Sequence, residues 1–218
     1  MRKILFGILA TLAILPSQGQ ELKKNGTSAD NIVPNGWDYI FEKGDLNKDG
    51  IADMAIITTP LNEDNIKVRD DGYVYNFNQP ILAIYWGNKD GSFSLFKQYN
   101  NVIPARPSEF ISIDPTLSIN DRQALSISLS YFASAGGWDS TTTTHRFRFQ
   151  NGDFFLIGED ESVVTRNTGA LTETSKNYLS HKQSVSTSNI SSKKKPVVKW
   201  TNLPKTPLRP LADGFELE

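Results

Sequence analysis

The chain has 218 residues, of which 38% are hydrophobic and 22% charged, so it is long enough for one large domain or two small ones with a real core. Its 23 Lys and Arg against 24 Asp and Glu give a net charge of -1, which argues against a nucleic-acid binder because such a domain is clearly basic. The chain has no Cys and two His, which excludes disulfides, thiolate metal sites, a cysteine nucleophile and a multi-histidine metal centre.

Residues 1–19 are typical of a secretory signal peptide. Arg2 and Lys3 precede an apolar run from Ile4 to Leu15, and the small residues Ser17 and Gly19 are spaced for cleavage after Gly19. A membrane anchor would need roughly 20 apolar residues, and no later stretch is long and apolar enough to span a bilayer. We therefore expect an exported chain that is periplasmic, at the cell surface or secreted, without a membrane span in its mature form.

The residues from 37 to 161 predict a β-domain, preceded by a flexible N-terminal segment at 20–36. Short apolar runs alternate with turn signals such as Asp90-Gly91 and Asn151-Gly152. The segment 124–132 alternates apolar residues with Ser at period two, and no window of similar length has helical periodicity. The pattern predicts an all-β fold, an antiparallel meander of about eight strands that forms a sandwich or a partly closed barrel.

Two regions interrupt the strand pattern. Residues 61–78 are polar and predict a long loop or a side hairpin. Residues 162–218 are rich in Ser, Thr, Asn and Lys and end in an arm with Pro204, Pro207 and Pro210, a spacing that favours extended backbone. We expect a polar extension and a Pro-rich C-terminal arm that packs on the β-domain, anchored by Trp200 and Leu203. A ligand for a proline-recognition partner is the alternative interpretation of the arm.

The segment 44–53 carries the clearest chemical motif in the chain. Its oxygen-bearing side chains fall at loop positions 1, 3, 5 and 9, Gly occupies position 6, and a backbone carbonyl is available at position 7. This arrangement suits a hard cation that takes six to eight oxygen ligands, whereas an empty loop would leave three carboxylates to repel one another. We therefore predict one Ca²⁺ held by Asp45, Asn47, Asp49, the Ile51 carbonyl and Asp53. An Asx-rich turn without an ion is the alternative.

The motif is not an EF-hand, because Ile56 stands at position 12, where a bidentate Glu is required. Its flanks, including Tyr39-Ile40-Phe41, predict strands and not helices. The loop resembles the calcium loop of the integrin-like FG-GAP and VCBS repeats, in which the same pattern joins two strands. That resemblance covers about residues 37–59 and implies the five ligands named above.

A wider resemblance covers most of the mature chain. The calcium-type loop is followed by an apolar run at 80–85, then by Asp90-Gly91-Ser92-Phe93, Gly136-Gly137-Trp138 and a Gly-Asp-Phe-Phe-Leu-Ile-Gly stretch at 152–158. This order is similar to a family of uncharacterised exported bacterial proteins. The resemblance implies a β-rich exported domain with a calcium-type loop, and it implies no activity.

Other candidate sites are weaker. The loop around Gly136, Gly137, Trp138 and Asp139 joins two strong strands and offers open backbone amides beside an aromatic ring, which fits a partner contact such as a stacked sugar. A wide hairpin loop with the Trp side chain folded onto the sheet is the alternative. The neighbouring acids at 159–161 and 70–71 predict solvated turns, because sequence neighbours on a strand point to opposite faces.

We expect no catalytic residues and interpret the chain as a calcium-stabilised binding module of the cell envelope, whose partner is an envelope protein or a glycan. One alternative is a hydrolase acting on glycans or peptidoglycan, which would require a pocket with two converging carboxylates. A second alternative is an inhibitor or immunity-like protein, which would present a protruding loop to an enzyme cleft.

Overall fold

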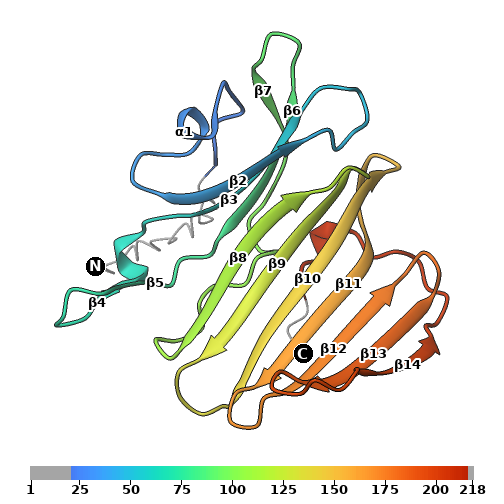
Figure 1. Ribbon diagram of the computed structural model, residues 1–218. Helices are drawn as coiled ribbons and strands as arrows, with labels where there is room; N and C mark the ends of the chain where they lie inside the picture. The colour runs from blue at the N-terminus through green and yellow to red at the C-terminus, as the bar shows by residue number, and fades with distance from the viewer. Residues whose placement is uncertain (1–20, 216–218) are drawn as a thin grey trace, which may run out of the picture.

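The computed structural model describes residues 21–215 and has an all-β architecture with antiparallel sheets (Figure 1). The predicted signal peptide, residues 1–19, lies outside the described residues. Two sheets pack face to face as a sandwich, and a separate two-stranded hairpin projects from the body.

The first sheet has five strands in the order β1-β7-β6-β3-β2. Its strands are β1 (Asn25–Gly26), β2 (Asp38–Gly44), β3 (Asp53–Thr59), β6 (Ile81–Gly87) and β7 (Phe93–Tyr99). The two central strands, β3 and β6, are buried on both faces, which explains why they read as continuous apolar runs without alternation. One face of this sheet is covered by the short helix α1 (Ala29–Ile32), whose Ile32 is fully buried.

The second sheet is a meander of seven strands in which each strand pairs antiparallel with its neighbour in the chain. Its strands are β8 (Ile111–Ile119), β9 (Ala124–Ala133), β10 (Asp139–Gln150), β11 (Asp153–Thr165), β12 (Ala170–Asn177), β13 (Lys182–Asn189) and β14 (Val197–Asn202). A bulge between Arg146 and Phe147 shifts the β10–β11 register, and such irregularities bend a sheet.

The main core lies between the two sheets. Ala55, Ile57 and Leu82 of the first sheet pack in one cluster with residues of β9, β10 and β11. The inward residues of β10 include Phe147, as the alternation of this strand requires, whereas Thr142 and Thr144 point to the outer face and are hydrogen-bonded to Ser side chains of β9. The outer face of this sheet is therefore polar along this part of the β9–β10 pair.

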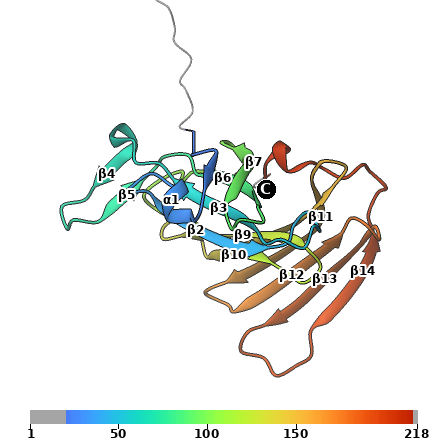
Figure 2. The ribbon, with the colours of Figure 1, turned by 90° about the horizontal axis from the view of Figure 1, so that it is seen from above.

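The seven-stranded sheet is wider than the five-stranded sheet. Seen from above, β12–β14 extend beyond the first sheet instead of lying beneath it (Figure 2). The C-terminal arm turns back from β14 toward β11: the Leu156 amide donates to the Arg209 carbonyl, and Leu211 in the 3-10 helix η2 (Leu211–Asp213) is fully buried. Part of the inner face thus lacks a covering sheet and is bordered by the arm.

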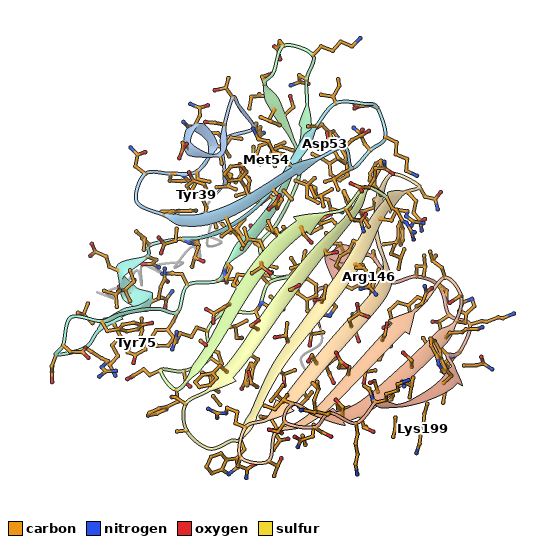
Figure 3. The ribbon with its side chains drawn as sticks, in the orientation of Figure 1. Tyr39, Asp53, Met54, Tyr75, Arg146 and Lys199 are labelled. Atoms are coloured by element: carbon orange, nitrogen blue, oxygen red, sulfur yellow. The ribbon has the colours of Figure 1, made fainter. Side chains whose placement is uncertain are left out.

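Residues 61–78 form the predicted side hairpin. A 3-10 helix, η1 (Glu63–Asn65), leads into β4 (Ile66–Val68) and β5 (Val74–Asn76), which pair with each other and lie apart from both sheets (Figure 1). Tyr75, on the inner side of this hairpin (Figure 3), is buried and contacts the guanidinium of Arg106.

The structure differs from the prediction in three places. The N-terminal segment is not flexible from residue 22 onward, because Leu22, β1 and α1 complete a small apolar cluster behind the first sheet. The domain boundary at 161 falls inside β11, and the polar residues that follow continue the same sheet. Trp200 does not anchor the arm: it lies in β14 with 69% of its surface exposed, and the arm is held instead by Arg209 and Leu211.

Candidate functional site

The predicted calcium loop connects β2 to β3 and is folded by its own side chains. The Asp45 carboxylate accepts hydrogen bonds from the amides of Lys48, Asp49 and Gly50 at 2.7 to 3.1 Å. Asn47 donates to the Asp49 carboxylate at 3.1 Å. Gly50 has a φ of 82°, a left-handed conformation that glycine adopts without steric cost. These contacts bring Asp45, Asn47 and Asp49 together.

Asp53 behaves differently from the other predicted ligands. It is the first residue of β3, it is fully buried, and it lies where the loop meets the end of β6 (Figure 3). One carboxylate oxygen accepts from the amides of Leu46 and Asn47 at 2.8 and 3.2 Å, and the other accepts from the Gly87 amide at 2.9 Å. Burial raises the pKa of Asp53, and these amide hydrogen bonds oppose that effect.

The oxygen-bearing side chains of the loop are the kind of ligand that a hard cation prefers, but they are not all positioned around one point. Within residues 21–215, no three acidic or histidine side chains are close enough together to hold a metal ion. Asp45 and Asn47 are half-buried, Asp49 is exposed, and the three lie near one another. By contrast, three of the roughly four lone-pair positions of the Asp53 carboxylate are taken by amides. Asp53 therefore ties the loop to both sheet strands and has about one position left for a ligand.

A cavity of about 710 Å³ lies on the uncovered part of the seven-stranded sheet. Its floor consists of inward-facing residues of β8–β12, and the C-terminal arm forms part of its wall. The apolar part of the lining comes from Pro107, Ile111, Ile113, Leu129, Leu156, Pro204, Pro207 and Leu208. The polar part comes from Tyr131, Thr141, Thr143, His145, Glu159, Glu161, Lys176, Tyr178, His181, Thr206 and Arg209. This size and this mixed lining are typical of small-molecule sites.

Three charged or titratable side chains form a cross-strand row on the cavity floor. His145, Glu159 and Lys176 are paired in register on β10, β11 and β12. Glu159 lies between the other two: one carboxylate oxygen is 2.8 Å from the Lys176 ammonium, and the other is 3.4 Å from His145 Nε2. The carboxylate is thus neutralised by an ion pair although its side chain is largely buried.

The imidazole of His145 is neutral at pH 7. Burial lowers its pKa to about 4, Lys176 and Arg209 act in the same direction, and Glu159 opposes them. Because Nε2 faces the Glu159 carboxylate, it carries the proton, and Nδ1 is left as an acceptor. Nδ1 is buried and has no hydrogen-bond partner. A buried acceptor without a partner is costly to the folded state.

Reasoning from sequence missed this cavity and its two glutamates. Glu159 and Glu161 are two residues apart on β11, so both point inward, while Asp160 points outward and pairs with Arg146. Glu161 is half-buried, and its side chain has no hydrogen bond or ion pair with residues 21–215. The signal was present in the period of two along a strand, which places acids at i and i+2 on one face.

The Gly-Gly-Trp loop is the β9–β10 turn, at the lower end of the seven-stranded sheet in Figure 1, whereas the calcium-type loop joins β2 and β3 of the other sheet at the top. Arg166 holds it by donating to the carbonyls of Gly137 and Trp138 at 2.7 and 3.1 Å. Trp138 is 64% exposed, so it is not folded onto the sheet. Asp139 begins β10 and accepts from the Thr165 hydroxyl at 2.7 Å. The loop is an ordered surface with an exposed ring.

Comparisons with known proteins found no match for this chain among family models, curated proteins or solved structures. Across residues 21–215, no helix has the length and apolar character needed to cross a membrane.

Proposed function

We propose that this chain is an exported binding protein that holds an amphipathic small molecule in the cavity on its seven-stranded sheet. The cavity is the observation that carries the proposal. It is large enough for a drug-sized ligand, and most of the wall that receives it is apolar. The proposal assigns binding to this cavity, whose lining includes no residue of the calcium-type loop.

One polar group of the cavity specifies the chemistry of the ligand. The half-buried Glu161 carboxylate lines the cavity, has no hydrogen bond or ion pair with residues 21–215, and accepts a hydrogen-bond donor or a cation. The ligand we infer has an apolar body and a hydroxyl or amine group, with the polar group lying toward β10 and β11. An anionic head group would be repelled by Glu161, whereas the second carboxylate of the same wall, Glu159, is ion-paired with Lys176.

Displacement of a fluorescent apolar amine tests this function. N-phenyl-1-naphthylamine should bind and brighten, and dodecylamine and dodecanol should displace it better than dodecanoate does. Thr143→Trp places a large ring in the cavity and should abolish binding. Thr142→Trp is the matched control, because the neighbouring residue faces the outer side of the same strand. Equal binding by both variants would contradict the proposal.

One observation favours the hydrolase alternative: two carboxylates, Glu159 and Glu161, line the same cavity. Two features make it the weaker function. A glycosidase requires its carboxyl groups on opposite sides of the scissile bond, whereas these two project from one face of one strand. It also requires a carboxyl group that is free to act on the substrate, whereas Glu159 is already held in an ion pair with the Lys176 ammonium at 2.8 Å. Release of reducing ends from peptidoglycan, lost in Glu161→Gln, would support the enzyme instead.

We propose further that one Ca²⁺ stabilises the β2–β3 loop through Asp45, Asn47, Asp49 and the Ile51 carbonyl, with the remaining lone pair of Asp53 as a fifth ligand. The convergence of the first three side chains supports this assignment. The ion would neutralise carboxylates that otherwise repel one another. Titration calorimetry against a chelated control tests it, and the absence of binding heat up to several times the expected dissociation constant would leave the loop as an Asx-rich turn.

A further inference from the structure

Four chain segments meet at one end of the seven-stranded sheet, the lower end in Figure 1. They are the entry to β8 and the turns β9–β10, β11–β12 and β13–β14. Backbone hydrogen bonds connect each to the next: Ser134 to Phe110, Arg166 to Trp138, and Ile190 to Gly169. The segments therefore form one continuous rim, although they come from residues more than 80 positions apart.

The rim exposes large apolar side chains at its turns. Phe110, Trp138 and Ile190 are 61%, 64% and 63% exposed, and Phe132 beside them is 40% exposed. Isolated apolar side chains on a surface are ordinary, but a run of them along adjacent turns marks an interaction site. Trp at such a site is suited to a boundary between water and an apolar phase, because its ring is amphipathic.

The same rim is cationic, in contrast to the chain as a whole. Lys193, Lys194 and Lys195 lie in the β13–β14 turn, are exposed and form no ion pair with residues 21–215. Arg166 lies over the Phe132 ring at 4.5 Å. Two acidic residues lie in these segments. Glu109 is ion-paired with Lys67, so Asp139 is the one remaining negative charge beside the three lysines and Arg166.

We propose that this rim docks the protein onto an anionic phospholipid membrane. The combination of exposed aromatic and aliphatic side chains with adjacent lysines matches both parts of a lipid surface: the rings enter the interface and the ammonium groups lie at the phosphates. A protein partner would be expected to cover the apolar cluster with a shaped surface. The rim instead presents its apolar groups on separate turn tips, which suits a fluid surface.

The orientation that follows places the cavity close to the membrane. Phe110 of the rim lies between two residues that line the cavity: Pro107, three positions before it, and Ile111, directly after it. The strands would stand on the membrane with their β9–β10, β11–β12 and β13–β14 turns downward. Docking does not depend on a cavity ligand, so it stands or falls separately from the proposed binding function.

Sedimentation with lipid vesicles tests the docking surface. The mature protein should bind vesicles that contain phosphatidylglycerol, bind phosphatidylcholine vesicles much less, and dissociate as salt is raised. Replacing the three lysines by Gln should lower the partition coefficient on anionic vesicles roughly 100-fold, about fivefold for each lysine. Trp138→Ala should lower it on the order of tenfold, because the ring loses apolar contact.

Matched variants separate docking from general charge and exposure. Lys89→Gln, Lys182→Gln and Lys205→Gln together remove the same charge from exposed sites away from the rim and should leave binding nearly unchanged. Trp200→Ala removes an equally exposed ring from the strand β14 and should also have little effect. Thermal melting verifies that each variant is folded.

Several results would overturn the proposal: no binding to anionic vesicles at low salt, equal binding to neutral vesicles, or equal losses in the rim and control lysine variants. If Trp138→Ala bound anionic vesicles as strongly as wild type, and dextran sulfate released the protein completely from them, the rim would be a site for a soluble polyanion. This result too would overturn membrane docking.

Discussion

Asp53→Asn distinguishes a structural carboxylate from a metal ligand. The substitution keeps the size of the side chain but replaces one acceptor oxygen by an NH₂ group. In the native loop, one Asp53 oxygen accepts hydrogen bonds from the backbone amides of Leu46 and Asn47, and the other accepts one from the Gly87 amide. The amide oxygen of Asn can serve one of these two sets, and its NH₂ group must then face the other. At least one buried amide of the strand ends is left without an acceptor.

The magnitude follows from these contacts. A buried donor without a partner costs roughly 1–3 kcal/mol. The retained hydrogen bonds also weaken, because bonds to an ionised acceptor are about twice as strong as neutral ones. We expect a loss of about 2 to 5 kcal/mol in the free energy of unfolding, a large part of the usual 5–15 kcal/mol of a domain. The loss should be present in chelator, with no metal involved.

Urea unfolding in EDTA measures this effect, with Asp49→Asn as the matched control. Asp49 is exposed and accepts from the Ile51 amide, so water can replace its contact, and the control should change stability by no more than about 0.5 kcal/mol. If Asp53→Asn unfolds at the wild-type urea concentration in EDTA but loses calcium binding, then Asp53 is a ligand and our account of its structural role is wrong.

Three further predictions concern the metal, the histidine and a close backbone contact. Calcium at ten times its dissociation constant, which we place at roughly 10⁻⁴ to 10⁻³ M, should stabilise the protein by about 1.4 kcal/mol; magnesium should do less, and melting of Asp49→Ala should show no calcium-dependent rise. Because burial lowers the pKa of His145 to about 4, the unfolded chain binds the proton first as pH falls, so stability should be full above about pH 6.5 and decline toward pH 4. Urea midpoints across this range should show the decline, roughly 3 kcal/mol in scale, in wild type but not in His145→Gln. Gly87→Ala should cost more than about 2 kcal/mol in urea unfolding, because the added Cβ would lie 2.2 Å from the Ala52 carbonyl oxygen; a loss below about 0.5 kcal/mol would show that the strands can separate there.

The strands of the fold were predictable where burial leaves a simple pattern. Residues 124–132 alternate because one face of β9 packs on the core and the other carries Ser that bonds to Thr of β10. The all-β class and the side hairpin at 61–78 are confirmed on this basis. The turn at 44–53 was predictable for a different reason, because its residue spacing is local; its binding of calcium stays a prediction.

The predictions were wrong where structure depends on contacts between distant segments. Residues 22–36 are polar and short of apolar periodicity, yet Leu22 and Ile32 are buried because the outer face of the first sheet needs a cover. Residues 170–202 lack apolar alternation because β12–β14 extend past the first sheet and have no buried face to encode. They form strands through backbone pairing with the edge of β11, and no periodicity in side-chain polarity records that pairing.

The cavity is a consequence of the same mismatch between the sheets. A seven-stranded sheet packed on five strands leaves part of its inner face uncovered, and β11 and β12 carry charged residues on that part. Glu159, Glu161 and Lys176 are tolerated on that face because no opposing sheet has to exclude water from them. Closer to the core, the same face changes to Leu129 and Leu156. The transition from apolar to charged lining is what gives the cavity its amphipathic character, and it follows from sheet width and not from any motif in the sequence.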